Sequence, residues 1–121
     1  MSLLLGFRPT LAAQLDLEPS VINLRSRGPA ITAHIEIAGI DPSRIDVSSV
    51  RLAGSVAPLT DFVTSGDHDR HGKRDLTLRF DRNALDPLLT PGTNELDVTG
   101  RLLTGEPFQG SDSIRVRVPA R

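Results

Sequence analysis

The side chains best suited to chemistry in this sequence gather in one charged segment, residues 67–75. In calcium loops of the EF-hand type, residues at fixed alternate positions turn oxygen atoms toward one ion, and a glycine at position 6 allows a sharp turn. Counted from the first Asp of the segment, Gly72 falls at that position. The candidate metal ligands are Asp67, Asp69, His71, Lys73 (through its backbone carbonyl) and Asp75.

Two departures from the calcium pattern weaken this site. Position 5 holds His71 in place of Asp or Asn, and position 12 holds Leu78 in place of the Glu that binds calcium through two oxygens. We therefore favour a metal-free, solvated hairpin loop whose Asp side chains bond to the nearby backbone. The alternative is a degenerate calcium loop at 67–75 that binds Ca²⁺ weakly, and we expect no other cofactor.

The histidines give little support for other chemistry. His68 and His71 carry the imidazole ligands that zinc, copper and nickel prefer, but no convincing third ligand accompanies them, so we interpret both as exposed turn residues. His34 lies on the polar face of a predicted strand, where we expect a surface histidine. No Gly-x-Ser-x-Gly nucleophile motif accompanies it. We expect no enzyme.

Two pairs of carboxylates have the composition of a general acid and base but fall at predicted turns or helix caps, where Asp is common for structural reasons. We assign these pairs, Asp41 with Asp46 and Asp81 with Asp86, to local structure.

Composition argues against several classes of function. The chain of 121 residues has 14 basic and 15 acidic residues, so no strong field would draw it to nucleic acid. It has no Trp or Tyr, which removes the aromatic platforms that stack on bases and sugars. No apolar segment approaches the roughly 20 residues that cross a bilayer. We therefore expect neither a nucleic-acid partner nor a membrane span.

Alternation of apolar and polar residues, the mark of half-buried strands, dominates the chain. It is clearest over 30–37, 75–81, 95–102 and 113–118, and weaker strands are expected around 15–17, 22–24, 50–52 and 59–63. Residues 81–89 and, more briefly, 42–45 have the character of single helical turns. Residues 104–107 indicate a hairpin loop of about four residues between two strands.

No long helical crossover separates these strands, so parallel βαβ units are excluded. Many short strands separated by turns suggest a sandwich or a barrel. We predict an all-β, antiparallel sandwich of about seven to eight strands with one short helical turn. We expect the sandwich domain to cover residues 14–119. Residues 1–13 are expected to be a lead-in that is either disordered or the remnant of a signal peptide or cloning scar.

Seven pieces of the chain carry a resemblance to a known module. They are LEPSVINLRSRG at 17–28, IDVSSVRL at 45–52, GDHD at 66–69, DL at 75–76, RFDR at 79–82, VTGRL at 98–102 and FQGSDSIRV at 108–116. In kind and order, these pieces resemble an immunoglobulin-like module of secreted and cell-surface proteins of bacteria and archaea, often found beside dockerin-like domains. Typical members have the loop Gly-Asp-x-Asp-Gly-Asp-Gly-x-x-Asp, whereas this chain has Arg70 and His71 at the two inner positions.

The resemblance implies an immunoglobulin-like fold, export from a bacterial cell and a place among neighbouring domains. We therefore expect a non-catalytic structural, spacer or interaction module, secreted or at the cell surface, whose partners are neighbouring domains or another protein. One alternative is a ligand- or protein-binding sandwich that carries the degenerate calcium loop. The other is a surface subunit that assembles with itself. Because inward aliphatic residues close the two sheets, we expect no pocket for catalysis.

Overall fold

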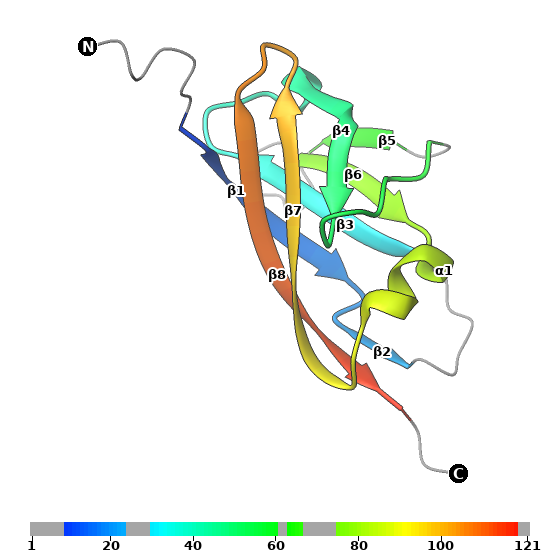
Figure 1. The fold of residues 1–121 in the computed structure, drawn as a ribbon. Helices are drawn as coiled ribbons and strands as arrows, with labels where there is room; N and C mark the ends of the chain where they lie inside the picture. Colours follow the sequence, from blue (N-terminus) through cyan, green and yellow to red (C-terminus); the bar gives the residue numbers. More distant parts are fainter. Residues whose placement is uncertain (1–8, 24–29, 61–62, 67–74, 119–121) are drawn as a thin grey trace.

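Eight strands and three helical turns form the part of the chain that the computed structural model describes, residues 9–23, 30–60, 63–66 and 75–118 (Figure 1). The strands are β1 (Leu11–Glu18), β2 (Val21–Asn23), β3 (Ile31–Ile37), β4 (Ile45–Leu52), β5 (Val63–Gly66), β6 (Asp75–Phe80), β7 (Gly92–Leu102) and β8 (Pro107–Arg117). The helical turns are η2 (Pro42–Arg44), α1 (Arg82–Leu85) and η3 (Asp86–Leu88). The prediction of an all-β chain with a short helical turn is confirmed.

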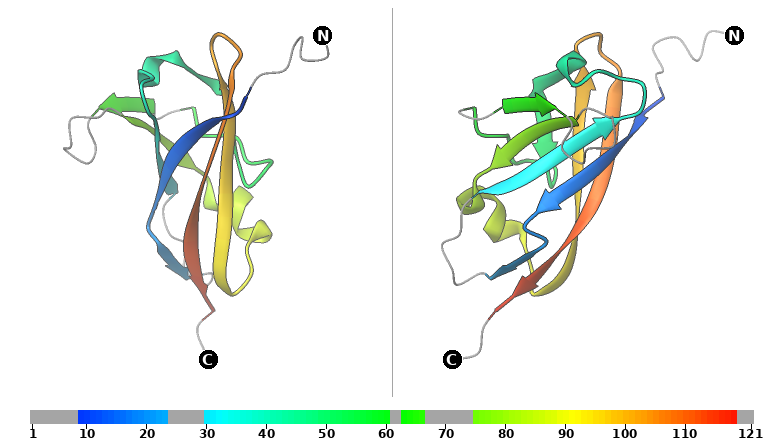
Figure 2. Two further views of the ribbon diagram at one scale, coloured as in Figure 1. Left: turned by 90° about the vertical axis from the view of Figure 1, so that its left-hand side faces the viewer. Right: turned by 180° about the vertical axis from the view of Figure 1, so that it is seen from behind.

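The strands lie in two layers (Figures 1 and 2). One layer holds β1, β3, β6 and β5, and the other holds β4, β7, β8 and β2. Leu11 and Ala12 of β1 also pair with β8, so the path β4-β7-β8-β1-β3-β6-β5 is continuous and the sheet nearly closes into a barrel. The prediction of purely antiparallel pairing was wrong. The sheet is mixed, because β1 and β2 both run parallel to β8.

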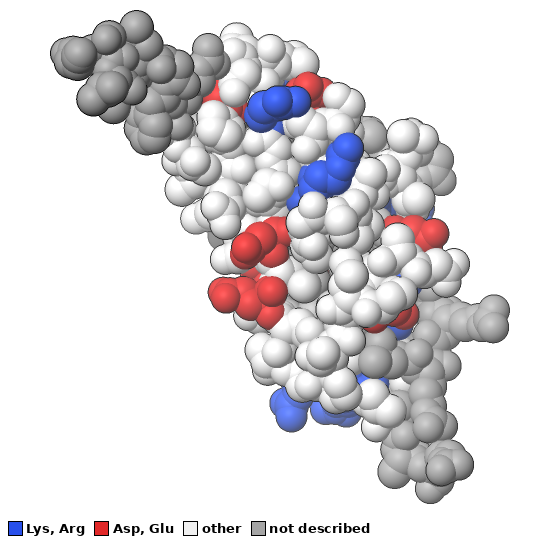
Figure 3. Space-filling view, in the orientation of Figure 1, with Lys and Arg blue, Asp and Glu red and all other residues white. Residues whose placement is uncertain are grey.

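Aliphatic side chains at every second strand position fill the space between the layers, and many charged side chains lie on the outside (Figure 3). The alternating segments supply most of this core, namely Ile31, Ala33, Ile35, Ile37, Leu76, Leu78, Phe80, Leu96, Val98, Leu102, Ile114 and Val116. Val118 is an exception, since it lies beyond the end of β8 and is 47% exposed. Removal of this apolar surface from water is the main force that stabilises the fold.

Element positions differ from expectation in two places. The first strand starts at Leu11, before the expected domain boundary at residue 14, because Leu11 and Ala12 pair with Phe108 and Gln109. A strand was expected over 59–63. Leu59 and Thr60 are not in a strand, residues 61–62 lie outside the described residues, and β5 is described from Val63. The backbone N–H of Leu59 donates to the carbonyl of Arg79 at 2.8 Å. The loop between β7 and β8 spans residues 103–106, which confirms the predicted hairpin.

The carboxylates assigned to turns and caps have structural roles. Asp41 and Asp81 cap η2 and α1, because each accepts a hydrogen bond from the backbone N–H two residues later, at 2.9 Å. Asp46 accepts hydrogen bonds from the N–H and hydroxyl of Ser48 at the irregular start of β4. These contacts satisfy backbone groups that no strand or helix partner reaches.

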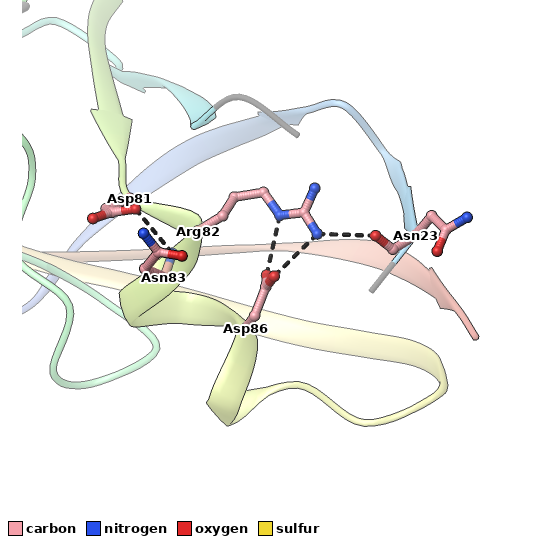
Figure 4. Close-up of polar contacts among 5 residues, drawn as sticks. All are labelled: Asn23, Asp81, Arg82, Asn83 and Asp86. Carbon is pink, nitrogen blue, oxygen red and sulfur yellow. Dashed lines mark hydrogen bonds and ion pairs between the residues drawn. The ribbon is translucent and has the colours of Figure 1, made fainter. Parts of the chain in front are cut away.

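Asp86 binds a buried arginine (Figure 4). Arg82 of α1 donates from Nε and Nη2 to the two carboxylate oxygens of Asp86, at 3.1 and 3.0 Å. Nη2 also donates to the carbonyl of Asn23 at 3.1 Å, which ties α1 to the end of β2. The paired guanidinium and carboxylate form the fork geometry that makes such ion pairs strong and directional.

Gly110 allows β1 to approach β8. A Cβ atom added to this glycine would lie 2.5 Å from the backbone carbonyl oxygen of Ala13. Real carbon and oxygen atoms do not approach so closely, and a backbone carbonyl within a strand moves only when the strand moves. The close contact of the two strands therefore requires glycine at this position.

We predict that Gly110→Ala lowers the free energy of unfolding by about 2–3 kcal/mol, because the new methyl group must push β1 away from β8. Urea unfolding followed by circular dichroism measures this loss. Ser113→Ala on the exposed side of the same strand is the matched control and should change stability by less than about 0.5 kcal/mol. Equal stability of the two variants would contradict the role assigned to Gly110.

Candidate functional site

An open groove of about 790 Å³ runs beside β1. From the sequence we expected no pocket for catalysis; the fold does leave a groove, and its use in catalysis stays untested. Residues 10–16 form one wall, and the rest comes from His34 and Glu36 of β3, Asp75 of β6 and residues 109–111 of β8. Alternation along single strands did not reveal it, because the groove forms where β1 passes from one layer to the other.

The divergence of β1 and β8 opens this groove. β1 pairs with β8 only at Leu11 and Ala12, and from Ala13 to Glu18 it pairs with β3. Farther along, the side chain of Asp112 on β8 spans the gap, and its Oδ2 accepts a hydrogen bond from the backbone N–H of Leu17 at 2.8 Å. A carboxylate thus takes the place of a strand partner for a backbone donor.

His34 is a polar side chain of the groove with a hydrogen-bond partner at each ring nitrogen. Its Cα lies between those of Asp16 on β1 and Thr77 on β6 in the strand register. The Nδ1 atom lies 2.9 Å from the hydroxyl of Thr77, and the Nε2 atom lies 3.3 Å from Oε1 of Glu18. The prediction of a surface histidine was wrong: His34 is on the polar face but only 8% exposed, because neighbouring strands cover it.

These two partners determine how the imidazole can bond. A carboxylate only accepts, so Nε2 carries a hydrogen toward Glu18. In the neutral ring the Thr77 hydroxyl donates to Nδ1, and in the charged ring that hydroxyl turns to accept. Both forms of the ring are therefore hydrogen-bonded at both nitrogens, so general-base catalysis by His34 would require the loss of one of these bonds.

Three acidic side chains supply most of the charge in the described lining. Asp16, Glu36 and Asp75 face the groove, and His34 is the only basic residue among the described residues that line it. Such a lining favours cationic over anionic ligands. Within the described ranges, however, no three His, Cys, Asp or Glu side chains come together as ligands for one metal ion.

Most of the predicted calcium loop lies outside the described residues. This applies to Asp67, Asp69, His71 and Lys73, and also to His68. Of the candidate ligands only Asp75 is described, and it starts β6 opposite Gly66, with 6% of its surface exposed. Calcium binding at 67–75 therefore stays a prediction.

Sequence reasoning missed the partners of His34. Alternation placed Thr77 on a polar strand face, and Glu18 follows the weaker strand expected around 15–17, but they are 43 and 16 residues from His34 along the chain. Only the pairing of β3 with both β1 and β6 brings them together.

The described part of the chain has no helix long and apolar enough to cross a membrane.

Comparison of the chain with protein-family models, with curated proteins and with solved structures gave no match.

We predict that Thr77→Val lowers the free energy of unfolding by about 1–2 kcal/mol. Valine keeps the shape of threonine but leaves the buried Nδ1 of His34 without its hydroxyl partner. Chemical denaturation measures the loss, and Thr99→Val on the exposed face of β7 is the control, with an expected change below about 0.5 kcal/mol. No difference between the two variants would show that the Thr77 bond contributes nothing to stability.

We predict that calcium at about 1 mM raises the melting temperature by no more than a few degrees, because a loop short of carboxylate ligands binds calcium weakly. Differential scanning fluorimetry measures the shift, with magnesium at the same concentration as the control for ionic strength. A calcium-specific rise of more than about 10 °C would instead support a complete site.

Proposed function

We propose that this chain is a non-catalytic structural module with an immunoglobulin-like β-sandwich fold, which holds neighbouring domains apart in an exported or cell-surface bacterial protein. The resemblance of its sequence pieces to such modules supports the bacterial, exported setting. The observation that carries the spacer role is the placement of the first and last described strands.

Strand order supports the immunoglobulin-like fold. Immunoglobulin constant-type domains have strands A, B, E and D in one sheet and C, F and G in the other. If β1 and β3 to β8 are lettered A to G along the chain, the sheet order β1-β3-β6-β5 reads A-B-E-D, and the order β4-β7-β8 reads C-F-G. Pairing of the first strand with both layers leaves this order intact.

The two ends of the described chain lie at opposite ends of the molecule (Figure 1). β1 starts beside the β7–β8 loop, and β8 ends beside β2 at the far end. β8 has 11 residues. At about 3.4 Å per residue, a strand of this size holds its two ends roughly 35 Å apart. Domains joined at the two ends would be separated by this rigid length.

The parallel pairing of β1 and β2 with β8 would help such a spacer to resist a pulling force. β1 and β2 both run parallel to β8, so pulling the two ends of the molecule apart slides these strands past each other. Hydrogen bonds that lie across the direction of sliding share the load, whereas a hairpin pulled open at its free end loses its bonds one at a time.

The groove supports this proposal over catalysis. Both ring nitrogens of His34 are bonded to Thr77 and Glu18. These bonds stabilise the contact among β1, β3 and β6, and an imidazole held in this way is poorly placed to abstract a proton from a substrate.

Single-molecule force spectroscopy tests the spacer role. We expect the full chain, attached through its two termini, to break at a higher force than the same chain attached through Thr93→Cys and Arg115→Cys. Those two positions face each other at the open end of the β7–β8 hairpin, so force applied there unzips it. The chain has no cysteine of its own, which makes the attachment specific.

Chemical denaturation of the unattached double-cysteine variant checks that the two substitutions leave the fold intact. Equal rupture forces for the two attachments, or a lower force through the termini, would reject the spacer proposal.

A further inference from the structure

The outer face of the β7–β8 hairpin carries its charges in blocks. Arg101 lies beside the hairpin loop, Asp97 and Glu95 follow toward the middle, and Arg115 and Arg117 lie at the far end. All five are exposed. Figure 3 shows basic groups toward both ends of this side of the molecule with acidic groups between them. The outward residues between Arg101 and Arg115 on the two strands are Thr93, Glu95, Asp97, Thr99, Gln109, Ser111 and Ser113.

These charges are unused within the fold. Among the described residues, none of the five charged side chains makes a hydrogen bond or ion pair. By contrast, neighbouring Arg51 on β4 is bonded to its own strand, since Nη1 donates to the carbonyls of Ser48 and Val50 at 3.1 and 2.7 Å. The hairpin face therefore presents exposed charges of both signs in a fixed order.

That order is self-complementary about one position. Thr99 lies midway between Arg101 and Asp97 on the same strand, about 7 Å from each at 3.4 Å per residue. Two copies can lie face to face about a twofold axis that crosses β7 at Thr99. In that arrangement β7 of one copy faces β7 of the other in the opposite direction, and each Arg101 faces Asp97 of the other copy.

Side chains near this axis allow close approach. Gln109 is the strand partner of Thr99, so the axis crosses β8 at Gln109. Each of these two residues then meets its own copy, and both are uncharged. Arg51, the strand partner of Thr99 on β4, lies at the same level, and its guanidinium is bonded to the carbonyls of Ser48 and Val50 in its own strand. The left view of Figure 2 shows that α1 and the loop after β4 project beyond β7, which limits the contact to the hairpin itself.

We propose that the outer face of the β7–β8 hairpin docks a second copy of this chain, antiparallel and face to face, with Arg101 of each copy paired to Asp97 of the other. A two-stranded face is small, and exposed ion pairs contribute little each, so the dimer is weak and sensitive to salt. The proposal is independent of the spacer role, which depends on β1, β2 and β8.

Sedimentation equilibrium of the full chain from about 10 µM to 1 mM measures this association. We expect a monomer–dimer equilibrium that weakens severalfold when NaCl rises from about 50 to 500 mM. A monomer at every concentration, or a dimer that salt does not weaken, would overturn the proposal.

Charge reversal identifies the paired residues. Asp97→Arg alone and Arg101→Asp alone should each weaken self-association by at least about tenfold, because each places like charges opposite one another in both symmetric contacts. A mixture of the two variants should associate nearly as well as the wild type, since the two arginines of one variant face the two aspartates of the other. This rescue distinguishes a specific twofold contact from a general effect of net charge.

Arg117→Asp is the matched control on the same face. Arg117 lies eight residues from Gln109 along β8, beyond the reach of the other copy's hairpin loop, which begins after Leu102. This variant should associate as the wild type does. Failure of the mixed variants to associate, or equal weakening by Arg117→Asp, would contradict the proposed register.

Discussion

The sharing of β1 between two layers is the constraint on which the rest of the structure depends. β1 touches β8 closely enough at Ala13 that only glycine fits at position 110, and it then turns to pair with β3. This crossing joins the two layers into one nearly closed sheet. It opens the groove on one side and brings β2 into parallel contact with β8 farther along.

Polar side chains in and around the core serve this arrangement. His34 joins three strands through Glu18 and Thr77, and Arg82 joins α1 to β2. A buried polar group without a partner destabilises a fold, so each of these side chains is useful only where the strands bring its partners to it. The groove is thus first a consequence of how β1 crosses, and its histidine stabilises that crossing.

Charges on the hairpin face differ from those in the groove. The groove histidine is bonded within the fold, whereas Arg101 and Asp97 project from a sheet without any partner among the described residues. Side chains that are already hydrogen-bonded within the fold resist rearrangement. Exposed charged side chains can form an ion pair with another molecule. The proposed spacer role depends on contacts of the first kind, and the proposed self-association depends on charges of the second kind.

The sequence alone determined most of the strands and their inward faces, because alternation along one strand depends only on which residues reach the core. It also located the capped turns at Asp41 and Asp81, where a side chain bonds to backbone two residues away. It did not determine that β1 and β2 run parallel to β8, that His34 is buried, or that a groove exists. Each of these depends on which strands become neighbours across many residues of chain, and only the tertiary structure decides that pairing.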